Sequence, residues 1–245
     1  MRFLGLAGLA ALLVLGGCNR PAATAPDTTT TTATSAVAAP TQDWTQVIVA
    51  TPEGGFRMGN PDAKVKLLEF ASLTCPHCRE FHEQGMPTVT GTYVKSGKLS
   101  YEYRPFILNG IDFAPSLLVR CQPANVAFNL IGAFYENQPS WVQPFTKLTP
   151  DDQKRLQALP AEQQIKALAL TGGLDAFVRA RGIPRAKFDQ CLSDKAGVDK
   201  LSAIRDEAVT KYQLTGTPTF AINGTTQTDV FNWAKLQPKL ETALQ

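Results

Sequence analysis

Residues 65–84 read VKLLEFASLTCPHCREFHEQ. The first seven form an apolar run that predicts a buried strand, and residues 79–84 predict a helix. Cys75 and Cys78 lie at the junction, where they can close a small disulfide. The free N–H groups and the dipole of a helix N-terminus favour a thiolate on the first cysteine, and the thiolate is the form that attacks disulfides. The stretch therefore predicts a redox site.

The residues between the two cysteines fit this interpretation. Pro76 suits the first turn of a helix, because its missing N–H would have no partner there. His77 either adds a donor or a positive charge beside the sulfur of Cys75, or is a solvated histidine without effect. We expect Cys75 to be the exposed sulfur, since Cys78 lies a turn deeper in the helix.

The same segment also has the spacing of a metal site. Cys75, Cys78 and His82 form a C-x2-C-x3-H pattern. A closed zinc site needs four ligands, and a further cysteine or histidine nearby is not evident. We therefore predict no metal, and we assign His82 to the helix surface without a role.

Glu69 is the acidic residue of the predicted strand, and it precedes Cys75 by six positions. It shares a strand face with Val65 and Leu67, so we expect it to be at least partly buried. Burial favours the neutral form of a carboxyl group, which can then exchange a proton with a nearby thiol. The alternative is an exposed glutamate at the end of the strand.

The N-terminus predicts export. A positive start at Met1-Arg2 precedes an apolar run over residues 3–15. This run is shorter than the roughly 20 residues that span a membrane, and it is typical of a signal peptide over residues 1–17. The run ends in LGGC at residues 15–18, which resembles a bacterial lipobox. That resemblance implies cleavage before Cys18 and a lipid on its sulfur, and a plain signal peptide is the alternative.

Composition separates a tether from a folded part. Residues 18–43 are mostly Ala, Thr and Pro, cannot bury a core, and are predicted to form a lipidated, disordered tether. The whole chain is 44% hydrophobic, enough for a core. Its net charge of +3 is too small to indicate a nucleic-acid partner.

Cysteine parity predicts a second disulfide. The chain has five cysteines, at positions 18, 75, 78, 121 and 191. Lipidation of Cys18 leaves two pairs, and disulfides persist in exported proteins. We therefore predict a structural bridge between Cys121 and Cys191, with two buried free thiols as the alternative.

The order of the remaining patterns predicts one α/β domain that contains a block of helices. Residues 58–63 are expected to form a loop, and residues 113–210 show a helical pattern. The Asn223-Gly224 step predicts a hairpin, after which residues 233–244 predict a last helix. Strands are expected over residues 46–50, 65–71, 99–106 and 219–222, the third of them with one polar face.

Two motifs carry a resemblance to a known family. LEFASLTCPHC at residues 68–78 resembles the active-site segment of the DsbA-like branch of the thioredoxin superfamily. GTPTFAING at residues 216–224 resembles the superfamily's strand and turn that begin at a cis-proline. The resemblance implies a thioredoxin fold formed by residues 44–111 and 211–245, with residues 112–210 as an inserted helical domain.

The resemblance also implies roles for residues. Cys75 would be the nucleophile and Cys78 its resolving partner, in a reaction that needs no cofactor beyond their disulfide. Glu69 would be the acid near the buried cysteine, and the Pro76-His77 pair matches the oxidising branch. The Thr217–Pro218 bond would be cis and pack against the cysteines, so that the Thr217 backbone can bind an extended substrate segment.

The leading hypothesis is a membrane-tethered dithiol oxidase that faces a bacterial periplasm. Its partners would be reduced or unfolded exported proteins and a membrane protein that recycles the dithiol, and we expect a monomer. The alternatives are an isomerase or reductase of the same fold, a metal-binding lipoprotein, and a non-catalytic docking module. Isomerases of this superfamily usually carry an N-terminal oligomerisation domain, and only the Ala/Thr-rich tether occupies that place here.

Overall fold

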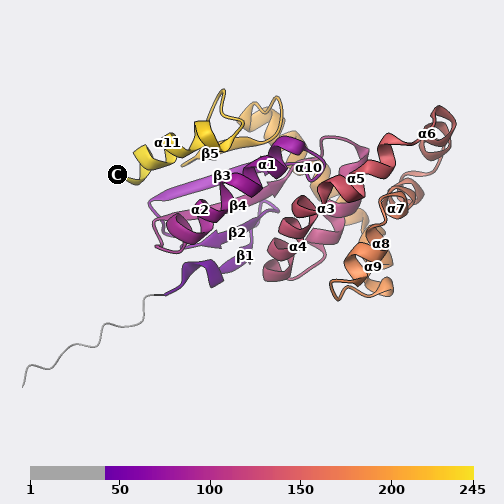
Figure 1. Ribbon diagram of the computed structural model, residues 1–245, viewed down its shortest axis with the longest axis horizontal. Coiled ribbons are helices and arrows are strands. Elements are labelled where there is room, and N and C mark those ends of the chain that lie inside the picture. The colour runs from indigo at the N-terminus through magenta and orange to yellow at the C-terminus, as the bar shows by residue number, and fades with distance from the viewer. Residues whose placement is uncertain (1–41) are drawn as a thin grey trace, which may run out of the picture. The chain divides into compact units, whose positions relative to one another are not determined.

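The computed structural model describes residues 42–245, which contain a six-stranded mixed sheet (Figure 1). The order across the sheet is β1-β2-β4-β3-β5-β6. β3 and β4 run parallel, and the other neighbouring pairs are antiparallel. The strands are β1 Ile48–Ala50, β2 Phe56–Gly59, β3 Val65–Ala71, β4 Leu99–Pro105, β5 Thr219–Ile222 and β6 Thr225–Thr226.

Helices follow β3, fill the chain between β4 and β5, and end the chain. A 3-10 turn, η1 Trp44–Gln46, precedes β1, a π-helical segment, η2 Val89–Val94, precedes β4, and a second 3-10 turn, η3 Gly110–Asp112, follows β4. The α-helices are α1 Pro76–Gln84, α2 Met86–Thr88, α3 Phe113–Arg120, α4 Ala124–Glu136, α5 Gln138–Thr146, α6 Pro150–Gln157, α7 Ala161–Thr171, α8 Leu174–Arg179, α9 Arg185–Leu192, α10 Lys195–Tyr212 and α11 Trp233–Leu244. Residues 112–210 remain our proposed bounds for the helical domain.

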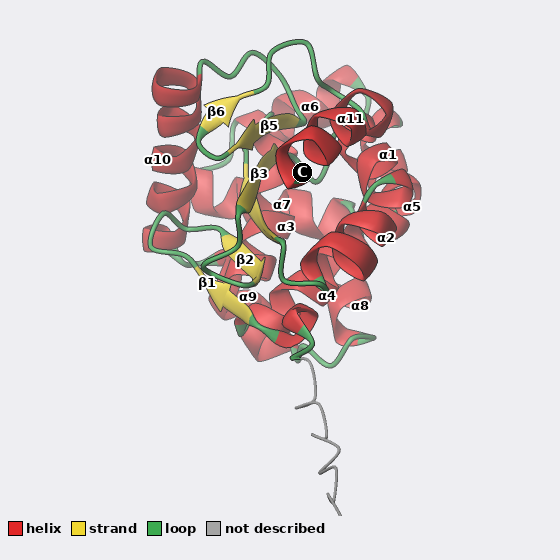
Figure 2. Ribbon diagram, turned by 90° about the vertical axis from the view of Figure 1, so that its left-hand side faces the viewer, coloured by secondary structure: helices red, strands yellow, loops and turns green. Residues whose placement is uncertain are grey.

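β3 lies at the centre of the sheet, and every residue of it except Lys66 is buried. Alternate side chains of a strand point to opposite faces. Leu68 and Phe70 pack against α10 on one face, whereas Val65 and Leu67 join a cluster that contains α1 and α4 on the other. Figure 2 shows α10 on one side of the sheet and α1, α2 and α11 on the other. Glu69 therefore lies on the α1 face, below the helix that follows the cysteines.

One strand prediction was confirmed and one prediction, of a loop, was wrong. β4 has the predicted polar face, formed by Ser100, Glu102 and Arg104, and most of this face is buried. Ser100 and Arg104 are buried, and Arg104 pairs with Glu102 at 2.7 Å. The loop expected over residues 58–63 overlaps β2, which pairs with β1 and β4. Turn-forming residues on both sides of this short strand led to the prediction of a loop, and its pairing with β4 shows that it is a strand.

The predicted hairpin is present. Asn223 and Gly224 have φ values of 49° and 83°, a left-handed pair that suits the two-residue turn between β5 and β6. The Asn223 side chain also accepts a hydrogen bond from the Lys66 N–H at 2.8 Å. The hairpin is thereby attached to the start of β3.

Cys121 and Cys191 form a disulfide between the end of α3 and α9, across a sequence separation of 70 residues. Cys191 is fully buried. The bridge joins two helices of the segment between β4 and β5.

The signal peptide and the lipidated Cys18 were predicted at positions outside residues 42–245, as was nearly all of the tether. No helix in the described part of the chain is long and apolar enough to cross a membrane.

Candidate active site

The two cysteines of the predicted redox pair lie at the N-terminus of α1. Cys75 is the N-cap residue, Pro76 begins the helix, and Cys78 is in its first turn. Both are free thiols in this structure. The prediction of an exposed Cys75 was wrong, because Cys75 is 4% exposed and Cys78 is 0% exposed. The Cys75 thiol donates to the Thr217 carbonyl oxygen at 3.2 Å, so the Thr217–Pro218 loop contacts its sulfur.

The environment of Cys75 lowers the pKa of its thiol from 9.0 to about 6. The largest cause is a hydrogen bond from the Cys78 thiol. Burial opposes this, while the Thr217 side chain and the backbone N–H groups of Cys78 and His77 add to the lowering. A Cys75 thiolate is therefore the main form of the reduced pair at neutral pH.

Cys78 is shifted in the opposite direction. Burial, and then the adjacent Cys75 and the charge of Glu69, raise the pKa of the Cys78 thiol well above 9.0. The reduced pair consequently contains one thiolate and one thiol, and the thiolate is on the cysteine nearer the helix end.

His77 takes part through its backbone. Its side chain is 68% exposed, and Nδ1 lies 3.4 Å from a carboxylate oxygen of Glu80. Its backbone N–H, by contrast, contributes to the lowered pKa of Cys75. The charge expected beside the sulfur thus faces another side chain and solvent in this structure.

Glu69 is 0% exposed on the α1 face of β3. Its Oε2 accepts a hydrogen bond from the Tyr101 hydroxyl and lies 3.2 Å from His82 Nε2. Its Oε1 has no hydrogen-bond partner among residues 42–245. The carboxyl group is therefore placed below the cysteines, away from solvent.

The assignment of His82 to the helix surface was wrong. Its side chain is 10% exposed, and its ring lies on that of Tyr135, with centroids 4.1 Å apart. His82 is four residues after Cys78, so both lie on one face of α1. That spacing was visible in the sequence, but the neighbours that cover the face come from β3, β4 and α4.

The predicted cis bond is present between Thr217 and Pro218, directly before β5. The Thr217 hydroxyl has no other hydrogen-bond partner in the described part of the chain, and it lowers the pKa of Cys75. The loop therefore presents both a carbonyl and a hydroxyl to the Cys75 sulfur.

Asp112 holds the loop before Cys75, and no motif in the sequence indicated this role. Its buried carboxylate accepts hydrogen bonds from the Ser72 hydroxyl at 2.9 Å and the Thr74 N–H at 3.0 Å. It also accepts from the N–H of Leu108 at 2.9 Å. Burial raises the pKa of Asp112 to about 6, against the effect of these hydrogen bonds. The carboxylate thus joins the loop after β3 to the loop after β4.

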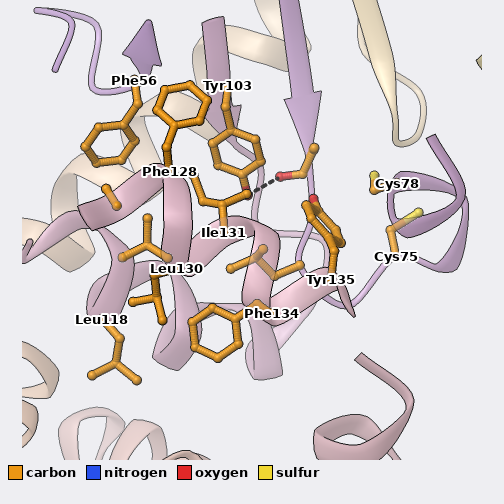
Figure 3. Packing of buried hydrophobic residues seen from close by; sticks show 14 of the residues in the cluster. Phe56, Cys75, Cys78, Tyr103, Leu118, Phe128, Leu130, Ile131, Phe134 and Tyr135 are labelled. Carbon is orange, nitrogen blue, oxygen red and sulfur yellow. Dashed lines mark hydrogen bonds between the residues drawn. The ribbon is translucent and has the colours of Figure 1, made fainter. Parts of the chain in front are cut away.

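Two further side chains from the helical segment fix the same loop. Gln138 donates to the carbonyl oxygens of Leu73 at 2.8 Å and Cys75 at 2.9 Å. The Tyr135 hydroxyl donates to the Ser72 carbonyl oxygen at 3.1 Å. Figure 3 shows Tyr135 beside Cys75 and Cys78. The position of Cys75 therefore depends on residues that follow it by about 60 positions.

No group of three or more His, Cys, Asp or Glu side chains within residues 42–245 is arranged to hold a metal ion. The site that the geometry defines is a pair of thiols with a buried carboxyl group and a histidine behind them.

Comparison with known proteins identifies the family. A family model described as thioredoxin matches residues 51–242. The chain belongs to the thioredoxin family. It is similar to the crystal structure of a protein-disulfide isomerase from Novosphingobium aromaticivorans, with 34% identity and a TM-score of 0.75, over 77% of this chain and 96% of that one. Wolbachia pipientis alpha-DsbA1 shares the fold, with 23% identity and a TM-score of 0.61, over 77% of this chain and 89% of that one. The thioredoxin fold with a helical insertion is thereby confirmed.

The curated relatives of this thioredoxin-family chain are longer proteins. A Rickettsia bellii protein named "Putative protein-disulfide oxidoreductase" is 25% identical over 194 residues, which cover 79% of this chain and 66% of that protein. A protein of Rickettsia prowazekii with a similar name is 24% identical, over 82% of this chain and 65% of its own length. The match to this chain thus covers about two thirds of each relative.

Proposed function

We propose that this protein is a thiol:disulfide oxidoreductase that acts through Cys75 and Cys78. The opposite pKa shifts of the two thiols carry the proposal, because they give one nucleophile and one buried resolving group. The names of the related proteins, which include an oxidoreductase and an isomerase of protein disulfides, support it.

The reaction follows from these positions. A substrate thiolate attacks the Cys75 sulfur of the oxidised pair, the Cys75–Cys78 bond breaks, and Cys78 leaves as a thiolate that takes up a proton. A second substrate thiolate then attacks the substrate sulfur of the mixed disulfide. A substrate disulfide forms, and Cys75 leaves as the favoured thiolate. Two electrons pass from the substrate thiolates to the cysteine pair.

We propose that Glu69 supplies the proton that Cys78 takes up. Cys78 is fully buried, and the carboxyl group of Glu69 is electrostatically coupled to it. A buried acid close to the leaving sulfur avoids a thiolate in an apolar site, where a charge is costly.

The proposed direction in the cell is oxidation of substrates. With a Cys75 pKa of about 6, the thiolate stabilises the reduced pair by up to about 1.4 kcal/mol at pH 7, relative to an unperturbed thiol. This value is an upper bound, because screening of the thiolate charge by solvent makes the stabilisation smaller. The same free energy corresponds to a rise of about 30 mV in the reduction potential of the Cys75–Cys78 pair, which makes its disulfide more oxidising. The stabilisation grows as the pH rises above the folded pKa.

An isomerase is the second candidate, because the similar Novosphingobium structure is described as one. The equilibrium constant of the Cys75–Cys78 pair with glutathione distinguishes the candidates. An oxidase gives a potential near the oxidising end of the family, about −120 mV, and oxidises a reduced peptide with two cysteines. A potential at or below about −270 mV would refute the oxidase proposal.

Substrate binding is proposed to use the Thr217–Pro218 loop. The Thr217 carbonyl oxygen lies 3.2 Å from the Cys75 sulfur, so it lies where an extended substrate segment would meet that sulfur. Recognition through backbone groups suits a protein that acts on many reduced or unfolded sequences. His77 and Pro76 would border this surface.

The proposed location is the periplasmic side of a bacterial membrane. The lipobox-like sequence before Cys18 supports a lipid anchor, with residues 18–43 as the tether. A membrane redox protein would reoxidise the pair, and we propose that the chain acts as a monomer. Membrane fractionation with mass analysis of the mature N-terminus tests the anchor.

A further inference from the structure

His82 lies where a buried cluster meets a groove. The groove has a volume of about 330 Å³ and is open at the surface between β2, α1, α2 and α4. Met58, Met86, Phe128 and Ile131 give it apolar walls, and Glu83 and Glu136 are its acidic groups. His82 also lines the groove, so its ring borders both the groove and the cluster around Glu69.

The two ring nitrogens of His82 have different surroundings. Nε2 lies 3.2 Å from Glu69 Oε2 and 3.4 Å from the Tyr101 hydroxyl. Within residues 42–245, Nδ1 has no side-chain hydrogen-bond partner, and it is not among the fully buried unpaired atoms. One nitrogen therefore contacts the buried carboxylate, while the other is accessible to water in the groove.

Glu69 needs such a route if it exchanges protons with Cys78, because neither residue has exposed surface. The other titratable groups around it are Tyr101 and Tyr103 on β4 and Tyr135 on α4. Burial raises the pKa of each of these hydroxyls well above 10.0, so they remain donors and do not release protons at neutral pH. Imidazole is the side chain that gains and loses protons most readily near neutral pH.

We infer that His82 is a positioning residue for the Cys75–Cys78 reaction, which holds Glu69 and carries its proton to and from solvent through the groove between α1 and α4. Tyr135 fixes the ring in the orientation that this requires, by stacking at a tilt of 35°. This inference rests on the proposed function, and it supplies a path by which a proton passes between the buried Glu69 and solvent.

The proton balance is complete. When Cys78 leaves as a thiolate, the Glu69 carboxyl gives it one proton and becomes a carboxylate. Neutral His82, with its proton on Nε2, then takes one proton from groove water on Nδ1. The imidazolium gives its Nε2 proton to Glu69 and is left as the Nδ1–H tautomer. When the dithiol is reoxidised, the Cys78 thiol returns one proton to Glu69, Glu69 returns one to Nε2, and Nδ1 releases one to groove water, which restores the Nε2–H tautomer.

The test is the rate of oxidation of a peptide with two cysteines, measured from about pH 5 to 9 with the oxidised full-length protein. His82→Gln keeps an N–H near the Nε2 position but cannot carry a proton. We expect it to slow the reaction at least about 10-fold and to remove one ionisation from the pH–rate profile. The equilibrium constant with glutathione should stay within about 2-fold, because a proton carrier changes both directions equally.

His82→Ala provides the second measurement, because it opens the site to small molecules from the groove. Added imidazole should raise the rate of this variant in proportion to its concentration and leave the wild-type rate unchanged. An unchanged rate and pH profile in His82→Gln would overturn the inference. So would a slower rate with an equally shifted equilibrium constant and no rescue by imidazole, since that pattern indicates a purely structural role.

The outcome for the wild type separates this inference from the proposed function. A wild-type protein that fails to oxidise the peptide refutes the function. A wild-type protein that oxidises it, together with a His82→Gln variant of equal rate, refutes only the role of His82.

Discussion

Replacing Cys78 by alanine should raise the pKa of Cys75, because the Cys78 thiol is the largest cause of its lowering to about 6. The full shift from 9.0 corresponds to about 4 kcal/mol. A hydrogen bond to a charged group contributes about 1.5–3 kcal/mol, or about 1–2 pKa units. We therefore expect a pKa of about 7–8 for Cys75 in Cys78→Ala.

Cys78→Ser is the matched control, since its hydroxyl can still donate to the thiolate. Its Cys75 should keep a pKa near the wild-type value. At pH 7 the thiolate fraction of Cys75 should fall from about nine tenths in the reduced wild type to about one half or less in Cys78→Ala.

The assay is the rate of alkylation of Cys75 by iodoacetamide as a function of pH, with the modified peptide identified by mass spectrometry. Peptide identification separates Cys75 from the other cysteines of the chain. Equal midpoints in Cys78→Ala and Cys78→Ser would refute the reasoning. The backbone N–H groups at the start of α1 would then account for the low pKa without the neighbouring thiol.

Three further predictions concern other parts of the chain. Asp112 has a pKa of about 6 in the fold against 3.8 in the unfolded chain, so its contribution to the free energy of unfolding is fully present below pH 3.8 and decreases by about 3 kcal/mol as the pH rises through 6. Asp112→Asn should flatten this pH dependence in urea titrations, and an unchanged slope would contradict the assignment. Replacing Cys121 and Cys191 together by serine should lower the free energy of unfolding by about 2–4 kcal/mol, with the Cys75 alkylation rate unchanged, and equal stability would count against a structural bridge. Cys18→Ala should release the protein from the membrane fraction, and continued membrane association with an unmodified N-terminus would rule out the lipid anchor.

The sequence alone determined the features that depend on neighbours along the chain. An apolar strand followed by Cys75-Pro76-His77-Cys78 places two thiols at a helix N-terminus, because strand, junction and helix are consecutive. The hairpin at Asn223-Gly224 follows for the same reason, since its turn depends on the left-handed conformation of two adjacent residues. The order of strands and helices was also sufficient to predict one α/β fold with an insertion.

Only the tertiary structure decided what surrounds the thiols. Cys75 was expected at the surface, but the Thr217 carbonyl group contacts its sulfur from 142 residues away. His82 was assigned to the helix surface, but Glu69 and Tyr135 contact its ring from other elements. The chemistry of the pair depends on which groups lie beside each sulfur. Hydrogen-bond donors stabilise the thiolate of Cys75, whereas burial without such donors keeps Cys78 in the thiol form. Those neighbours are brought together by packing of the helical segment against the sheet, which no local pattern records.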